Sequence, residues 1–198
     1  MTQTPKPQNA VKPPNADGLA QAASTASRKG PPPVHLWNPP FCGDMDMEIR
    51  RDGTWFYLGT PIGRPALVRL FASILKLEDG KYFLVTPVEK VGIRVVDAPF
   101  VAVDCDISGA GAAQTLRFTT NVGDTVVAGP DHPIRVVRDA EGEPSPYVHI
   151  RRGLEALIDR KTFYRLVDHA VPGAHEGVEW LGLWSEGVFF PIIPMAEL

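Results

Sequence analysis

Two aspartates, Asp44 and Asp46, stand two residues apart in the segment CGDMDME. On a β-strand this spacing places both carboxylates on one face, where they could bind a divalent cation or a pair of sugar hydroxyls. A structural role also fits, because Asp44 can hold a turn after Gly43 and Asp46 can lie in solvent at a strand start. The pair is a candidate site with both interpretations open.

The segment TPIGR, residues 60–64, comes directly before a predicted helix. Free backbone N–H groups and the helix dipole favour an anion there, and Arg64 could add a bidentate contact to a phosphate or carboxylate. In the alternative interpretation, Thr60 and Gly63 only shape the turn and Arg64 is a surface residue. This segment is the best candidate anion site in the sequence.

Two further pairs are candidates for ligand contacts. Glu89 and Lys90 follow a predicted buried strand, where a carboxylate could bind a base or sugar and an ammonium a phosphate; such neighbouring loop charges are commonly just solvated. Trp55 and Tyr57 lie on one face of a predicted strand, with Phe56 on the other, so either face could be the buried one. An aromatic face that lines a cleft would stack a base, whereas most aromatic faces belong to a core.

His132 and Arg135, in the segment GPDHPIR, would bind an anion together if they converged on a cleft. Alone, a loop histidine beside a proline is usually a surface residue. The histidines and cysteines lack the spacing of a metal site, and no serine or cysteine lies in a known nucleophile motif. We therefore predict no catalytic or metal-ligating residue, and the sequence names no cofactor.

The composition limits the classes of function. The chain has 198 residues, 44% of them hydrophobic and 22% charged, as in ordinary globular proteins. A net charge of -3 gives no field that would attract a polyanion, so we expect no bulk nucleic-acid binding. The start MTQTPKPQNAVKPP lacks the pattern of a secretory signal, and no stretch reaches the roughly 18 apolar residues of a membrane span. With only two cysteines, we expect reduced thiols and a cytoplasmic location.

The elements that must position these residues are mainly short strands, separated by turns among twenty prolines and eighteen glycines. Residues 1–34 are rich in Pro, Ala and Ser and are predicted to be a disordered tail, whose end could be a spacer or a docking peptide. Two helices interrupt the strands. In GRPALVRLFASILKLEDG, Pro65 suits the first turn, and in DRKTFYRLVDHAVPG, Asp159 is a potential N-cap.

A repeated motif, IRRDG at residues 49–53 and IRRG at residues 150–153, precedes both helices at similar intervals. The residues between motif and helix also correspond, with one short gap, although two unrelated pieces with common strand–turn–helix grammar are an alternative. Duplication predicts an α+β fold with two β-rich units, residues 35–97 and 98–198, each a curved antiparallel sheet packed by one helix. The cleft between such units is the natural place for a ligand.

Several long segments resemble one bacterial family. These are CGDMDMEIRRDGTWFYLGTPIGR, LVRLFASIL, DGKYFLVTPVEKVGIRV, HPIRV and GLEALIDRKTFYRLV, and the family is catalogued as domain of unknown function 1285. The resemblance covers nearly everything after Val34. It implies a duplicated two-domain core with a pleckstrin-homology-like C-terminal part. It also implies a pocket at the domain interface for a nucleotide-like ligand, with a role in signalling.

The leading hypothesis is a non-enzymatic binding or sensory module for a small anionic, nucleotide-like ligand between two related units. Arg64 and the helix start would hold the negative charge, and Trp55 or Tyr57 would stack. Glu89, Lys90 and Asp46 would orient polar groups of the ligand. Ligand closure would present a surface to a protein partner in signal transduction. The alternatives are a metal-dependent hydrolase that uses Asp44 and Asp46, and a protein-interaction scaffold that acts through sheet edges or the proline-rich tail.

Overall fold

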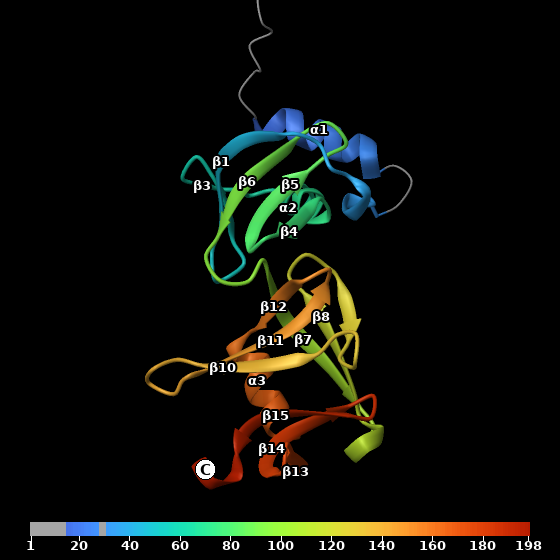
Figure 1. Cartoon of the computed structure of the whole chain (residues 1–198), viewed down its shortest axis with the longest axis vertical. Coiled ribbons are helices and arrows are strands. Elements are labelled where there is room, and N and C mark those ends of the chain that lie inside the picture. The colour runs from blue at the N-terminus through green and yellow to red at the C-terminus, as the bar shows by residue number, and fades with distance from the viewer. Residues whose placement is uncertain (1–14, 28–30) are drawn as a thin grey trace, which may run out of the picture.

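The computed structural model describes residues 15–27 and 31–198, and its first unit is a six-stranded sheet that curls over one helix (Figure 1). The strand order is β3-β2-β1-β6-β5-β4. Alternate residues of the strands point toward the helix, and Met47, Ile49, Trp55 and Phe71 are buried there. The elements are β1 (Phe41–Ile49), β2 (Trp55–Tyr57), β3 (Thr60–Pro61), α2 (Pro65–Ser73), β4 (Leu75–Glu78), β5 (Lys81–Val85) and β6 (Lys90–Val95).

The second unit has a six-stranded sheet and a separate three-stranded sheet (Figure 1). The orders are β10-β11-β12-β7-β8-β9 and β13-β14-β15. Phe100, Leu116, Phe118 and Leu154 form part of its core. The elements are β7 (Phe100–Ser108), β8 (Thr115–Thr120), β9 (Thr125–Val127), β10 (Ile134–Arg138), β11 (Pro144–Arg151), β12 (Leu154–Ile158), α3 (Arg160–Val167), β13 (Val171–His175), β14 (Val178–Ser185) and β15 (Val188–Pro194). Short 3-10 turns lie at Val34–Leu36, Gly111–Ala113 and Met195–Glu197.

The two units share an order of elements that is consistent with duplication. A hairpin (β1-β2 or β11-β12) leads to a helix (α2 or α3) and then to three antiparallel strands (β4-β5-β6 or β13-β14-β15). The pairing of the last strand differs. In the first unit β6 pairs with β1, whereas β10 takes that place beside β11 in the second. Because β10 occupies this edge, β15 cannot pair with β11 and the last three strands form their own sheet.

The expectation of purely antiparallel sheets is wrong for one pair of strands in each unit. β1 and β6 are parallel, and so are β7 and β12. In the first unit, the chain crosses over through α2 before β6 returns beside β1, so the two strands run in the same direction. Both large sheets are therefore mixed.

The predicted first helix ends earlier than its sequence pattern suggests. Pro65 is in its first turn, as predicted, but the helix stops at Ser73 and residues 75–78 form β4. The apolar spacing of LKLE has a period of two as well as fitting a helix, and Leu75 pairs with Leu84 of β5. Pairing with β5 decides between the two. The second helix has the predicted cap, because the Asp159 side chain accepts a hydrogen bond from the Thr162 N–H at 2.7 Å.

The prediction of a disordered tail is wrong for Ala16–Ala26, which form the helix α1. The Asn15 side chain caps it by accepting a bond from the Gly18 N–H at 2.9 Å. Leu19 and Ala23, one turn apart, are fully buried, and α1 packs against α2. Alanine has the highest helix propensity, and its small side chain allows close helix contact, so a segment poor in large apolar residues still folds here. The rest of the predicted tail before Asn15, and residues 28–30, lie outside the described residues.

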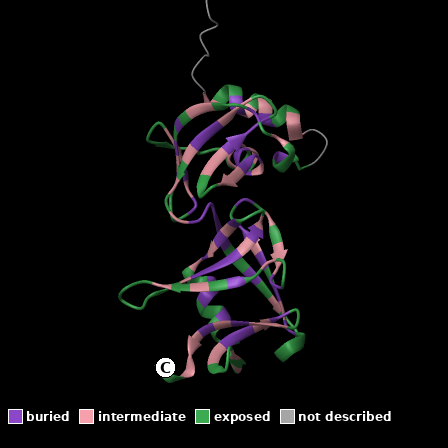
Figure 2. Cartoon of the chain, in the orientation of Figure 1, coloured by how far each residue is buried: buried purple, intermediate pink, exposed green. Residues whose placement is uncertain are grey.

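Buried residues occur inside both units and along the segment that connects them (Figure 2). This segment follows β6, and its residues Ala98, Pro99 and Phe100 are buried. The two units are therefore joined by packed chain. Among the residues that the structure describes, no helix has the length and apolar content to cross a membrane.

Candidate functional site

The repeated arginine motifs form two turns that meet at the seam between the units. The first turn, residues 51–53, joins β1 to β2, and the second turn, residues 151–153, joins β11 to β12. Gly53 and Gly153 have φ of +81° and +78°, a region that other residues rarely adopt. In the first turn, the Thr54 N–H bonds to the Asp52 carboxylate at 2.9 Å and lowers the pKa of Asp52. In the second, the Gly153 N–H donates to Nε2 of His149 at 3.0 Å.

A third turn, residues 121–124 between β8 and β9, contacts both of these turns. Asn121 donates from Nδ2 to the Gly53 carbonyl at 3.3 Å and accepts from the Val101 N–H at 3.0 Å. Asp124 forms an ion pair with Arg151. The β8–β9 turn therefore links the first unit's turn to the second unit's turn.

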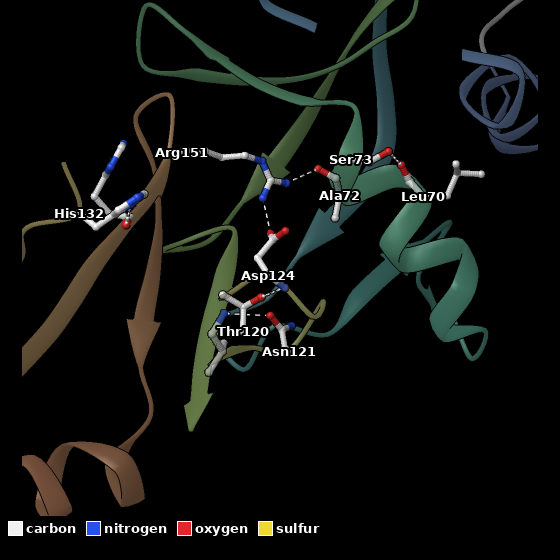
Figure 3. Close-up of polar contacts among 10 residues, drawn as sticks. Leu70, Ala72, Ser73, Thr120, Asn121, Asp124, His132 and Arg151 are labelled. Atoms are coloured by element: carbon white, nitrogen blue, oxygen red, sulfur yellow. Dashed lines mark hydrogen bonds and ion pairs between the residues drawn. The ribbon is translucent and has the colours of Figure 1, made fainter. Parts of the chain in front are cut away.

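Arg151 crosses the seam to the end of helix α2. Its Nη2 donates to the Ala72 carbonyl at 2.9 Å (Figure 3), and its guanidinium lies 4.8 Å from the centre of the Phe100 ring. Carbonyls at a helix C-terminus carry partial negative charge, which favours a cation at this position. With Asp124 on its other side, Arg151 is fixed by both units.

A groove of about 580 Å³ lies between α2 and the second turn, and we call it the α2 groove. Three arginines, Arg69, Arg151 and Arg152, and one carboxylate, Asp124, line it. Arg69 and Arg152 have no carboxylate within 4.0 Å in the described part of the chain. The rest of the lining includes apolar side chains of Pro31, Pro32, Leu70 and Val122. The groove thus combines net positive charge with an apolar wall.

Arg69 also lines a smaller depression, of about 240 Å³, beside the α2 groove. Gly53 of the first turn, Asn121 of the β8–β9 turn and Gly63, which precedes α2, also line this depression. Arg69 is exposed and lies on the side of α2 that faces the second unit. Its guanidinium is therefore available to a ligand in either hollow.

The opposite side of the seam has its own polar cluster, which we call the Asp97 cluster. Arg51 donates from Nη2 to Ser145 Oγ at 2.8 Å, and its Nη1 lies 3.2 Å from the Asp97 carboxylate. The Tyr147 hydroxyl donates to Asp97 at 2.8 Å. Burial, and then this hydrogen bond to a carboxylate, raise the pKa of Tyr147. Arg135 stacks on the Tyr147 ring at 4.2 Å, so this predicted residue lies at the seam.

Asp44 and Asp46, which the sequence predicts as ligand contacts, are both exposed on β1. Asp44 lies against Gly92 of the neighbouring strand, where an added Cβ atom would come within 2.1 Å of Oδ1. Gly92 therefore provides the space for this carboxylate. In the described part of the chain, no three side chains of His, Cys, Asp or Glu are placed to hold a metal ion.

The residues of the predicted anion site lie directly before α2, in β3 and the segment that follows it. Thr60 and Arg64 are exposed, and Arg64 is the N-cap residue without a side-chain capping bond.

Trp55 is 1% exposed and stacks on Phe71 with ring centroids 6.2 Å apart, so it belongs to the core. Tyr57 is half-buried beside it on the strand. The face of β2 that carries Trp55 is therefore the more buried of its two faces.

Lys90 is already paired at the other side of the sheet from α2. Its Nζ lies 2.6 Å from the Glu78 carboxylate, which Lys76 also contacts at 2.6 Å. Hydrogen bonds from Lys76 and then Lys90 lower the pKa of Glu78. Glu89, in the turn before Lys90, accepts a bond from the Thr86 N–H through its backbone carbonyl at 2.9 Å.

His132 and Arg135 have separate partners in the structure. The His132 ring stacks on His149 with centroids 5.8 Å apart, and its Nδ1 lies 3.0 Å from the His149 carbonyl. Arg135 instead forms a bidentate pair with Glu155, at 2.7 and 2.5 Å, which raises the pKa of Arg135. His132 thus supports the residue that receives the Gly153 N–H.

The two cysteines are free thiols. Cys105 is 5% exposed, and burial raises its pKa to about 12. A thiolate at this position is therefore rare at neutral pH, which excludes it as a ready nucleophile.

The sequence reasoning did not select Arg69, Arg151, Arg152, Asn121 or Asp124 as site residues. For Arg151 and Arg152 a signal was present, because they are the repeated arginines of IRRG and a duplicated turn faces its counterpart when two units pack together. Asn121 and Asp124 carried no such signal, because a turn of Asn, Gly and Asp is common in any β protein. The seam, which neither spacing nor periodicity describes, brings these five residues together.

Fold and site together define a two-domain, β-rich protein whose repeated turns meet at a polar seam with a basic groove. The chain belongs to the DUF1285 family. Residues 32–98 match the model described as "Domain of unknown function (DUF1285), N-terminal domain", and residues 99–192 match "Protein of unknown function (DUF1285), C-terminal domain".

Two crystal structures of the same family are similar to the chain. A DUF1285 family protein from Silicibacter pomeroyi DSS-3 is 63% identical, with a TM-score of 0.82, over 91% of this chain and 97% of that one. A DUF1285 family protein from Shewanella baltica OS155 is 32% identical, with a TM-score of 0.48, over 62% of this chain and 91% of that one. No curated protein matches the chain.

Proposed function

We propose that the protein is a non-enzymatic module that binds a small anionic ligand in the α2 groove. The observation that carries this proposal is the charge of the groove, where three arginines face one aspartate around a volume of about 580 Å³. Volumes of this size are typical of sites for small molecules. An anion would reduce the repulsion among the arginines and accept several charge-assisted hydrogen bonds.

The lining also indicates the shape of such a ligand. Arg69 and Arg152 would contact the negative group, and Arg151 would share it with Asp124 and the Ala72 carbonyl. An apolar or planar part would lie on Leu70, Val122 and the prolines. A nucleotide-like molecule, with a phosphate at one end and a base at the other, has this combination.

Signalling is part of the proposal. The groove takes its walls from both units, so a bound ligand would favour one arrangement of the units over others. A protein partner that contacts the seam in a cytoplasmic setting would then respond to ligand occupancy. The pleckstrin-homology-like character expected for the C-terminal unit belongs to this proposal, supported by two sheets and one helix in that unit.

Binding of inorganic phosphate, AMP and glucose 6-phosphate, measured by calorimetry and by the rise in melting temperature, tests the proposal. Arg69→Gln is the informative variant, because the Arg69 side chain makes no bond across the seam in the described residues. We expect it to weaken binding about tenfold. Arg94→Gln, on the exposed face of β6, is the matched control and should bind as the wild type does.

Arg64→Gln separates the α2 groove from the anion site that the sequence predicts before α2. A loss of binding in Arg64→Gln with none in Arg69→Gln would move the site to the start of α2. Equal binding by wild type, Arg69→Gln and Arg152→Gln would reject the α2 groove.

A further inference from the structure

A second groove, of about 500 Å³, lies on the other side of the seam between the first turn and α3, and we call it the α3 groove. Leu157 and Ile158 of β12, Phe163 of α3 and Pro146 of β11 form its apolar lining. Ile158 and Phe163 are only 2% and 8% exposed, so the floor is continuous with the core of the second unit. An apolar group placed here would leave water without disturbing that core.

Two opposite charges, Arg160 and Glu143, also line the α3 groove. Arg160 Nε donates to the Tyr164 hydroxyl at 2.9 Å, and the guanidinium lies 5.6 Å from the Tyr164 ring. These contacts orient the guanidinium of Arg160 and leave its terminal nitrogens free to bind a ligand. Among the described residues, neither Arg160 nor Glu143 has an oppositely charged group within 4.0 Å.

The position of Glu143 is set by its backbone. Its N–H donates to the Asp139 carboxylate at 2.8 Å, and its carbonyl accepts from the Asp139 N–H at 3.2 Å. These bonds close the β10–β11 hairpin at this residue. The groove therefore has a cation, Arg160, and an anion, Glu143, on its rim, not bonded to each other, above an apolar floor.

We propose that the α3 groove binds a zwitterion with an apolar side chain, as found in apolar α-amino acids and in short apolar peptides. Arg160 receives the carboxylate in a bidentate contact, Glu143 receives the ammonium, and the side chain lies on Phe163, Leu157 and Ile158. A purely anionic or purely cationic ligand leaves either Glu143 or Arg160 without a partner, while the third charge of the lining, Arg51, is already paired with Asp97. Charge complementarity therefore selects the zwitterion.

Arg51 connects this groove to the seam. It lines the α3 groove and at the same time contacts Ser145 and Asp97. A ligand in the groove therefore lies against the first turn. This site is separate from the α2 groove and does not depend on the function proposed for it.

Calorimetry with L-phenylalanine and the dipeptide Leu-Phe tests the inference, beside N-acetyl-L-phenylalanine, which lacks the ammonium, and L-phenylalaninamide, which lacks the carboxylate. We expect the wild type to bind a zwitterion at least tenfold more tightly than either blocked analogue. Tighter binding of the free amino acid or of the dipeptide identifies which of the two sources of this chemistry fits the groove.

Two variants locate the charges. Glu143→Gln should remove the preference over the acetylated analogue, and Arg160→Gln should remove the preference over the amide. Both residues are exposed, so melting temperatures should stay close to that of the wild type. Lys161→Gln, the next residue along α3 and outside the groove lining, is the matched control and should leave all affinities unchanged.

Three results overturn the inference. The first is the absence of binding by both zwitterions at millimolar concentration. The second is equal affinity for the zwitterions and the blocked analogues. The third is binding that stays the same in Glu143→Gln and Arg160→Gln, because the ligand then lies elsewhere on the protein.

Discussion

Arg51 and Arg151 belong to the two copies of the repeated motif and each lies two residues before its glycine, yet their surroundings differ. The Arg151 side chain is 26% exposed and contacts Asp124 and the Ala72 carbonyl, whereas the Arg51 side chain is 58% exposed and contacts Asp97 and Ser145. Both turns contain a positive-φ glycine, but the second turn also has a positive φ at Arg152, so the two turns differ in local geometry. The neighbours differ as well, because the β8–β9 turn lies beside Arg151 and nothing equivalent covers Arg51 in the described structure.

The two grooves differ in the same way. The α2 groove has three arginines and one carboxylate, while the α3 groove has arginines and one glutamate whose charges are spread around its rim. Each groove lies between one unit's turn and the other unit's helix. Two units with a similar order of elements thus provide two hollows, and the residues that differ between them give the hollows different chemistry.

The largest expected effect separates the two arginines. Arg151→Ala should lower the free energy of unfolding by about 2–3 kcal/mol, because it leaves Asp124 and the Ala72 carbonyl without their charged partner. Arg51→Ala should cost under about 1 kcal/mol, because solvent screens its contacts. Urea denaturation of both variants measures the difference. Equal losses would show that the two turns are equivalent in stability.

For the glycines, we expect the substitution in the first turn to lower the free energy of unfolding more than the substitution in the second turn, which is the reverse of the order expected for the arginines. Gly53→Ala places a Cβ atom 2.5 Å from Asn121 Nδ2, which must move away from its bonds, so we expect a loss of about 2 kcal/mol. Gly153→Ala meets only Leu77, at 3.3 Å, and should cost about 1 kcal/mol from its positive φ alone. Thermal and urea unfolding check both values. A larger loss in Gly153→Ala would contradict the tight contact at Asn121.

A smaller effect should distinguish the Asp97 side of the seam by its pH dependence. The pKa of Tyr147 is raised in the folded state, so its contribution to stability is complete below about pH 10 and is lost as the pH rises through the raised value. Unfolding free energies between pH 8 and pH 11 should fall less steeply in Tyr147→Phe than in the wild type. Tyr164→Phe, at an exposed tyrosine, is the control. Parallel curves for wild type and Tyr147→Phe would refute the assignment.

The smallest effect concerns ligand affinity in the α2 groove. Asp124→Asn removes the carboxylate that competes for Arg151, while the Asp124 backbone bonds to Thr120 are kept. Phosphate should bind about threefold more tightly to this variant, by calorimetry at low salt. Weaker binding would mean that Asp124 positions Arg151 for the ligand and does not compete with it.

The strands were predictable where their pattern had one interpretation. The segments KYFLV and VEWLGLW lie on β5 and β14, because their turns and aromatic residues favour strands over helices. The end of α2 was not predictable from the sequence, since the spacing of Leu75 and Leu77 fits both a helix and a strand. Their pairing with β5 decides for the strand. Helix α1 was missed because its stability depends on packing of Leu19 and Ala23 against α2, a contact that composition does not report.

The sequence by itself determined the local geometry of this protein. It specified the repeated motif, the glycines with positive φ, the Asp159 cap and the proline at the start of α2. Only the tertiary structure decided that Trp55 is buried, that Lys90 is bound to Glu78 and that Arg151 reaches the end of α2. Local geometry follows from neighbouring residues through backbone sterics and short hydrogen bonds. The seam joins residues such as Arg151 and Ala72, which lie far apart in the chain, so their meeting depends on how the two units pack.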